Sequence, residues 1–242
     1  MCAPMRPDHL AGTSIPRFTY DTPTTPGNDF YDLCAGPEPL AMIFLPSFDH
    51  PITREYISRY IKTLPDLKGV RLACVVRSSP RQVAQTLEGR QLPFTLICDR
   101  PGVLYNFLGV ETAGLLNWSF EAQRIIRSAQ SRGLRYDRKA PQLLPLTLVI
   151  GREGAILFTH YGRNLTDMPG DCGAICSLCD EVAELTAARQ GTPAAPRRAK
   201  AGPHSDETLT LPDLAGDLTG ELPHLAAAPP AQEEDAIGKL FD

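Results

Sequence analysis

The sequence lacks long apolar runs and has no excess of charge of either sign. No 18 consecutive apolar residues occur among its 242 residues, so no segment is expected to span a bilayer. The opening stretch, MCAPMRPDHLAG, holds no apolar segment of signal-peptide length. A net charge of −4 and an isoelectric point of about 5.8 favour neither nucleic acid nor a membrane surface as a partner. We therefore expect a cytoplasmic protein without these partners.

Cysteine is present, but not in a pattern that predicts a disulfide framework. The chain has seven cysteines, and the thiols of cytoplasmic proteins are kept reduced. The cysteines are therefore expected to be small buried side chains, metal ligands or redox thiols. Because 43% of the residues are hydrophobic, the chain has enough apolar material for one good core.

The composition along the chain predicts one domain between two loose ends. Residues 1–14 are expected to form a flexible arm, and residues 15–190 a single domain. From about Gly191 onward, Ala, Pro and acidic residues dominate and no apolar period persists, so we predict that residues 191–242 are disordered. The last stretch, Asp235–Asp242, is ordinarily interpreted as a frayed terminus, and the alternative is a short docking peptide.

Apolar periodicity predicts an alternation of strands and helices. Residues 40–45 form a continuous apolar run typical of a central strand, and apolar residues recur at helical spacing from Pro51 to Leu64. Further strands are predicted over 70–76, 94–97, 146–150 and 155–161, and further helices over 79–88, 102–108, 117–132 and 171–190. This order predicts an α/β fold in which helices cover both faces of a mixed sheet with an antiparallel hairpin at its edge.

Three local motifs connect this order of elements to a known family. They are IPRFTY at residues 15–20, LPFTLICDRPGVLYNFLGV at 92–110 and PLTLVIGREG at 145–154. Over about residues 15–186 the chain resembles the peroxiredoxin-like branch of the thioredoxin superfamily, also called the alkyl hydroperoxide reductase/thiol-specific antioxidant family. The resemblance implies a thioredoxin-like fold and thiol-dependent antioxidant or oxidoreductase chemistry, for which we expect no cofactor and no bound metal.

The resemblance places the active site in the loop that follows the first central strand. The working cysteine of this superfamily lies at the start of the next helix, where the helix dipole lowers the pKa of the thiol. In this chain the matching loop runs from Pro46 to Thr53. His50 falls on the peroxiredoxin threonine and the first thioredoxin cysteine, and Thr53 falls on the peroxidatic cysteine and the second thioredoxin cysteine. Neither residue has a thiol, so the standard mechanism is not available to this loop.

Two other features of the loop follow from its composition and from the resemblance. At a helix N-terminus the protonated form of His50 is disfavoured, so a neutral imidazole is expected near pH 7. His50 then either accepts a proton or binds a ligand, or it is a substituted remnant that only caps the helix. Pro145 resembles the cis-proline of thioredoxins, which lies beside the active-site loop and exposes backbone to a bound peptide or thiol substrate. We therefore predict a cis peptide bond before Pro145.

Three cysteines gather on the last predicted helix. Cys172, Cys176 and Cys179 occupy an arc of about 60° beside its apolar face. They are interpreted as packing residues at the edge of the core, as redox thiols relocated from the usual loop, or as metal ligands with a fourth ligand such as His160. Cys172 is the candidate for reactivity because it begins the helix.

The function predicted from the sequence has two alternatives. One is a divergent thiol oxidoreductase that uses the cysteines of the last helix with a thiol reductant as partner. The other is a non-catalytic binding or regulatory module that docks a protein or peptide at the Pro46–Thr53 loop and Pro145. A cluster of basic residues is expected to be a solvated helix face, or else a surface for an anion or acidic partner. Its members are Arg124, Arg127, Arg132, Arg135, Arg138 and Lys139.

Overall fold

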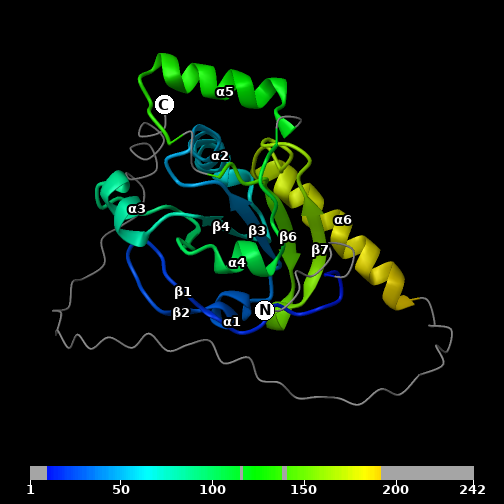
Figure 1. Ribbon diagram of the computed structural model, residues 1–242. Helices are drawn as coiled ribbons and strands as arrows, with labels where there is room; N and C mark the ends of the chain where they lie inside the picture. The colour runs from blue at the N-terminus through cyan, green and yellow to red at the C-terminus, as the bar shows by residue number, and fades with distance from the viewer. Residues whose placement is uncertain (1–9, 115–116, 138–140, 192–242) are drawn as a thin grey trace, which may run out of the picture.

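A computed structural model describes residues 10–114, 117–137 and 141–191 of the chain. Its main feature is a five-stranded sheet in the order β5-β4-β3-β6-β7 (Figure 1). These strands are Thr95–Cys98, Arg71–Val76, Leu40–Leu45, Leu146–Ile150 and Ile156–Tyr161, in that order across the sheet. The strands β3, β4 and β5 are parallel, whereas β6 and β7 are antiparallel to their neighbours. The sheet is therefore mixed, as the sequence predicts.

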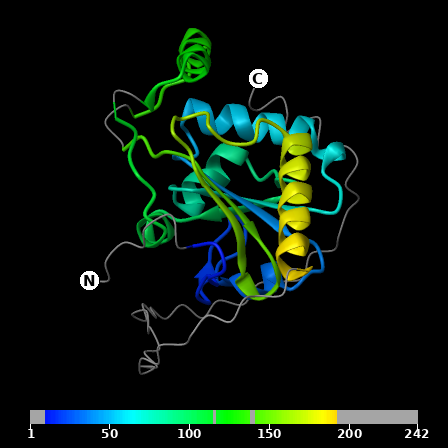
Figure 2. The same ribbon diagram turned by 90° about the vertical axis from the view of Figure 1, so that its right-hand side faces the viewer.

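Helices cover both faces of the sheet (Figures 1 and 2). One face packs against α2 (Pro51–Lys62), α3 (Pro80–Leu87) and α6 (Cys172–Gly191), and α5 (Phe120–Ser131) lies outside α2. The other face packs against α1 (Phe30–Cys34) and α4 (Val103–Phe107). Smaller elements are the ribbon of β1 (Thr19–Tyr20) and β2 (Asn28–Asp29) and the 3-10 turns η2 (Leu64–Asp66) and η4 (Arg152–Gly154). None of the helices in the described ranges is long and apolar enough to cross a membrane.

The central strand β3 explains how the core divides into two. All six of its residues are buried, and successive side chains of a strand point to opposite faces. Ile43 therefore joins the core beneath α2, α3 and α6, while Phe44 joins the core beneath α1 and α4. A strand covered on both faces needs a continuous apolar run, which is what residues 40–45 supply.

The two loose ends of the chain differ from the sequence prediction at one boundary. The side chain of Leu10 is fully buried, the Gly12 amide donates to the Ile156 carbonyl at 2.9 Å, and the Ile156 amide donates to the Thr13 carbonyl at 2.8 Å. Residues 10–14 therefore belong to the folded domain, and the predicted flexible arm of residues 1–14 does not extend over them. Residues 1–9 lie outside the described residues, and so does the predicted tail of residues 191–242 except for Gly191, which is the last residue of α6.

Candidate functional site

The loop between β3 and α2 is fixed by hydrogen bonds at both of its ends. The Phe48 amide donates to Ser78 Oγ at 2.8 Å, which ties the loop to the end of β4. The His50 amide donates to the Ser47 carbonyl at 3.0 Å and closes the turn before the helix. Pro51 then occupies the first helical position, where a missing N–H costs nothing and φ is already suitable. The predicted helix start is therefore confirmed.

Both ring nitrogens of His50 are hydrogen-bonded. Nδ1 accepts a hydrogen bond from the Ile52 amide at 3.2 Å, so His50 is the N-cap of α2. Because Nδ1 is an acceptor, the ring proton lies on Nε2, which donates to Gln142 Oε1 at 2.5 Å. The ring also meets Tyr136 edge-on, with 4.9 Å between the ring centroids. The geometry supports a neutral imidazole with no free nitrogen.

The surroundings of His50 oppose its protonation. Only 2% of the residue is exposed, and burial lowers its pKa to about 4, against the smaller opposite effects of the Gln142 hydrogen bond and the charge of Asp49. Near neutral pH the ring is therefore uncharged. A ring whose two nitrogens both have hydrogen-bond partners suits a structural cap better than a proton acceptor.

Thr53 lies in the first turn of α2 and is fully buried. Its Oγ1 has no hydrogen-bond partner among the described residues. The neighbouring Arg54 also has a buried Nε without a partner there, and burial lowers the pKa of its guanidinium, opposed by the charge of Asp49. An orphaned hydroxyl in an apolar setting costs free energy, so the position is better suited to a side chain without an oxygen.

The structure corrects the prediction made for Pro145. The described residues contain no cis peptide bond, so the bond before Pro145 is trans. The approach to β6 is extended and paired, because the Leu144 amide donates to the Glu111 carbonyl at 2.9 Å, and trans geometry suits such a segment. Pro145 is buried, and its carbonyl accepts from the Gly162 amide at 2.8 Å. It therefore offers no open backbone beside the loop.

The three cysteines of α6 lie in two different settings. Cys172 and Cys179 are buried within the core, and burial raises the pKa of both thiols, that of Cys179 to about 12. Cys176 is partly exposed, and its Sγ accepts a hydrogen bond from the Lys68 amide at 3.3 Å and lies 3.4 Å from the Asp66 carbonyl. The position of Cys172 at the helix start does not make it accessible, because its Sγ donates to the Tyr60 carbonyl inside the core.

Metal ligation by the same cysteines finds no support in the geometry. Across the described ranges, no group of three His, Cys, Asp or Glu side chains is placed to hold a metal ion. His160, the suggested fourth ligand, instead has its Nε2 3.1 Å from Asp167 Oδ1. The other described cysteines are Cys34, Cys74 and Cys98, which are buried with a raised pKa.

Sequence reasoning missed two partners of His50. Gln142 lies 92 residues further along the chain, and Tyr136 is in the segment after α5. Neither belongs to a motif, so only a map of pairs of residues that vary together would have placed them beside the loop.

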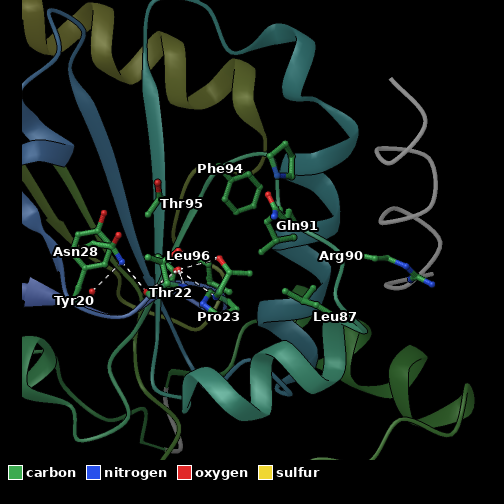
Figure 3. A pocket seen from close by; sticks show the side chains of 14 residues that line it. Tyr20, Thr22, Pro23, Asn28, Leu87, Arg90, Gln91, Phe94, Thr95 and Leu96 are labelled. Carbon is green, nitrogen blue, oxygen red and sulfur yellow. Dashed lines mark hydrogen bonds between the residues drawn. The ribbon is translucent and has the colours of Figure 1, made fainter. Parts of the chain in front are cut away.

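A cavity of about 440 Å³ lies away from this loop, between the β1–β2 ribbon and the segment leading into β5. Figure 3 shows Tyr20, Asn28 and Phe94 around it, with Arg90 pointing outward. Much of its polar lining is already paired, since the Asn28 side chain donates to the Thr25 carbonyl at 2.8 Å. The cavity shares no lining residue with Pro46–Thr53 or Pro145.

The basic cluster lies on and after α5. The described arginines of the cluster are exposed: Arg124, Arg127, Arg132 and Arg135. Arg138 and Lys139 lie outside the described residues. Glu121 lies on the same helix, but its carboxylate is engaged in a salt bridge at 3.0 Å with Arg59 of α2 and not with an arginine of the cluster. The four described arginines are therefore open to solvent, which is compatible with both predictions, a solvated helix face and a surface for an anion or acidic partner.

Comparison with known proteins identifies the fold. No protein-family model matches the chain, and neither does any curated protein. Among solved structures, a cysteine-to-serine mutant of peroxiredoxin 6 of Arenicola marina is similar, with a TM-score of 0.50 and 15% identity, covering 79% of this chain and 80% of that chain. This likeness confirms the thioredoxin-like α/β fold.

Two further solved structures are similar at lower TM-scores. Peroxidoxin BcpB from Mycobacterium tuberculosis has a TM-score of 0.46 and 17% identity, covering 74% of this chain and 97% of that chain. The mitochondrial 2-Cys peroxiredoxin from Plasmodium falciparum has a TM-score of 0.47 and 12% identity, covering 77% of this chain and 100% of that chain.

Proposed function

We propose that this protein is a non-catalytic binding or regulatory module that keeps the peroxiredoxin-like fold without peroxidase chemistry. The observation that carries the proposal is the state of His50, whose two ring nitrogens both have hydrogen-bond partners in a site that is 2% exposed. The resemblance places a reactive group at this helix start, and here the start is occupied by a cap. A buried neutral imidazole with no free lone pair neither accepts a proton nor activates a nucleophile.

The neighbouring position supports the same proposal. Thr53 stands where the resemblance places the peroxidatic cysteine, and its hydroxyl is fully buried without a partner. A threonine hydroxyl stays protonated at neutral pH, and no described base lies against this one. The loop still exposes Asp49, and a partner protein or peptide is expected to contact the loop at this residue. Pro145, which is buried, does not take part.

Relocated thiol chemistry is the second candidate, and one observation favours it. Cys176 is the partly exposed thiol among the described cysteines, and it lies about one helical turn from both Cys172 and Cys179. Two of these thiols would form a disulfide as one peroxide molecule is reduced to water, with the two thiol hydrogens ending in the water formed. A thiol reductant would then restore them. The raised pKa of Cys172 and Cys179 weighs against this route.

Peroxide consumption by the reduced full-length protein separates the two candidates. The intact mass is recorded before and after exposure, and the triple variant Cys172→Ser, Cys176→Ser and Cys179→Ser is the control. The binding-module proposal predicts no consumption above buffer and an unchanged mass. Rapid, stoichiometric loss of two hydrogens that the triple variant abolishes would instead establish the thiol oxidoreductase.

A further inference from the structure

The outer edge of β5 lies beside the cavity of about 440 Å³. Strand β5 is at one end of the sheet order and pairs with β4 on its inner side. The Asp99 amide donates to the Val76 carbonyl of β4 at 2.9 Å, whereas the Cys98 amide donates outward to the Asp21 carbonyl at 2.8 Å. Successive residues of a paired strand turn their main-chain groups to opposite sides, so Leu96 faces outward as Cys98 does.

The main chain of Leu96 has two groups without partners. In the part of the chain that the structure describes, neither its amide nor its carbonyl has a hydrogen-bond partner. Only 2% of the residue is exposed, so bulk water reaches these groups poorly and leaving them unpaired costs free energy. One residue of an antiparallel strand exchanges two hydrogen bonds with an outward-facing residue of this kind. The groups of Leu96 are therefore complementary to a peptide main chain.

The turn after β1 explains why this edge is not covered by the β1–β2 ribbon. Beyond Asp21 the chain bonds to itself, because the Thr22 amide donates to the Thr25 carbonyl at 2.8 Å and the Gly27 amide donates to Asp21 Oδ1 at 2.9 Å. The cavity lies between this turn and Leu96. Its volume falls in the range of about 300–1,000 Å³ that is typical of ligand pockets, which is enough for a short extended segment.

The two sides of the cavity differ in character. A residue that pairs with Leu96 has its side chain on the same face of the sheet as the Leu96 side chain. On that face the cavity is lined by Leu87 and Leu92, which belong to the core beneath α2, α3 and α6. The residues on either side of the paired one point to the other face, where Thr95 and Tyr20 line the cavity. Figure 3 shows Tyr20 and Leu87 on opposite sides of Leu96.

The cavity carries little charge. Among its described lining residues Arg90 is the one charged side chain, and its guanidinium forms an ion pair at 3.4 Å with Glu88. Thr24, Thr25 and Gln91 are exposed neutral residues of the lining. A charged ligand would lose water here without gaining an opposite charge, so the lining favours a neutral ligand.

We propose that this cavity binds a short, neutral, extended segment of a partner protein, which adds a strand to the outer edge of β5. One residue of the segment lies opposite Leu96 in antiparallel orientation and exchanges two main-chain hydrogen bonds with it. Its side chain is apolar and contacts Leu87 and Leu92, and polar residues flank it on the side of Thr95. This binding site goes beyond the proposed function, because it shares no lining residue with the Pro46–Thr53 loop.

Through-hydrogen-bond NMR couplings on the free, full-length protein test the open edge. Ile97 is the matched control, because its amide faces β4 and donates to the Cys74 carbonyl by the same alternation. We expect a coupling from the Ile97 amide to that carbonyl and none from the Leu96 amide. A coupling from Leu96 to a carbonyl of its own chain or of a second copy would overturn the proposal, because the edge would already be covered.

Peptide binding is measured with the probe Ac-Thr-Val-Thr-NH2, in which valine is the residue expected opposite Leu96. It is titrated to about 10 mM, which covers dissociation constants in the millimolar range. We expect saturable shifts of the Leu96 amide and of residues 20–28 and 91–96, with a new coupling from that amide to the valine carbonyl. No saturable shift would mean that solvent alone fills the cavity, and shifts confined to residues 46–53 would place the peptide elsewhere. Either result would overturn the proposal.

Two N-methylated versions of the probe separate main-chain pairing from other binding. Methylation of the valine amide removes the donor to the Leu96 carbonyl and is expected to weaken binding at least about tenfold. Methylation of the second threonine amide alters an N–H that points away from β5, so binding should stay within about threefold of the probe. Equal weakening by the two methyl groups would show that the probe does not pair with Leu96, and the proposal would be wrong.

Discussion

The substitution Thr53→Val tests the account of the loop through stability. Thr53 is fully buried and its Oγ1 has no described hydrogen-bond partner. Valine has the same branched shape and a closely similar helix propensity, so the change removes the hydroxyl alone. Leaving a buried polar group unpaired costs about 1–3 kcal/mol. We expect Thr53→Val to raise the free energy of unfolding by about 1 kcal/mol, which corresponds to about 2–4 °C in Tm for a domain of this size.

Thr63→Val is the matched control for this measurement. Its Oγ1 accepts a hydrogen bond from the Cys172 amide at 3.0 Å and donates to the Arg59 carbonyl at 2.8 Å. The same chemical change should therefore lower the free energy of unfolding by about 1–2 kcal/mol. Urea unfolding followed by far-UV circular dichroism measures both. If Thr53→Val destabilises the protein as much as Thr63→Val does, the hydroxyl of Thr53 has a partner and the reasoning is refuted.

Three further predictions concern the loop and the thiols. The pKa of His50 is about 4 in the folded protein and about 6.5 unfolded. The unfolded chain therefore binds more protons between these values, and the free energy of unfolding falls by about 3 kcal/mol as pH drops from 7 to 4. His50→Asn keeps a helix cap but has no imidazole, so its free energy of unfolding should not show this fall between pH 7 and pH 4 when urea unfolding is measured at both pH values. An equal fall in the variant would contradict the low pKa of His50. In Thr53→Cys, burial is expected to raise the pKa of the new thiol by up to about 3–5 units. The helix N-terminus lowers the pKa of a thiol, but its effect is worth at most about 2 kcal/mol, so burial outweighs it. The new thiol should thus titrate above pH 8.5 by alkylation rate, and a thiolate below pH 8 would refute this. Iodoacetamide should label Cys176 before the buried Cys172 and Cys179. Peptide mass mapping, with Cys176→Ser as the control, measures the order of labelling. Equal labelling of the three thiols would contradict the burial of Cys172 and Cys179.

The elements with strong apolar patterns could be predicted from the sequence. The strands 40–45 and 146–150 are confirmed at both ends, because a buried strand needs an unbroken apolar run. The predicted helix from Pro51 ends at Lys62 instead of Leu64, since helix ends depend on local hydrogen bonds that periodicity does not reveal. The ribbon of β1 and β2 was missed because two-residue strands are too short to show any period.

The candidate site could be located from the sequence, but its chemistry could not. The β3 run and Pro51 fix where the loop lies. The state of His50 depends on Gln142 and Tyr136, which the fold brings to it from distant segments. The prediction of a cis bond before Pro145 was wrong because it rested on resemblance, while the paired extended segment before β6 is trans. The burial of Cys172 likewise depends on Tyr60 of α2, which its own helix pattern does not contain.

The central claim is that His50 is a neutral structural cap and not a reactive group. Its most direct test is a pH titration of the ring nitrogens by ¹⁵N NMR on the folded, full-length protein, with His50→Asn identifying the signals. The account predicts the Nε2–H tautomer near neutral pH and a midpoint near pH 4. A proton on Nδ1, or a midpoint at pH 6.5 or above, would mean that a ring nitrogen is available for chemistry and would contradict the proposed function.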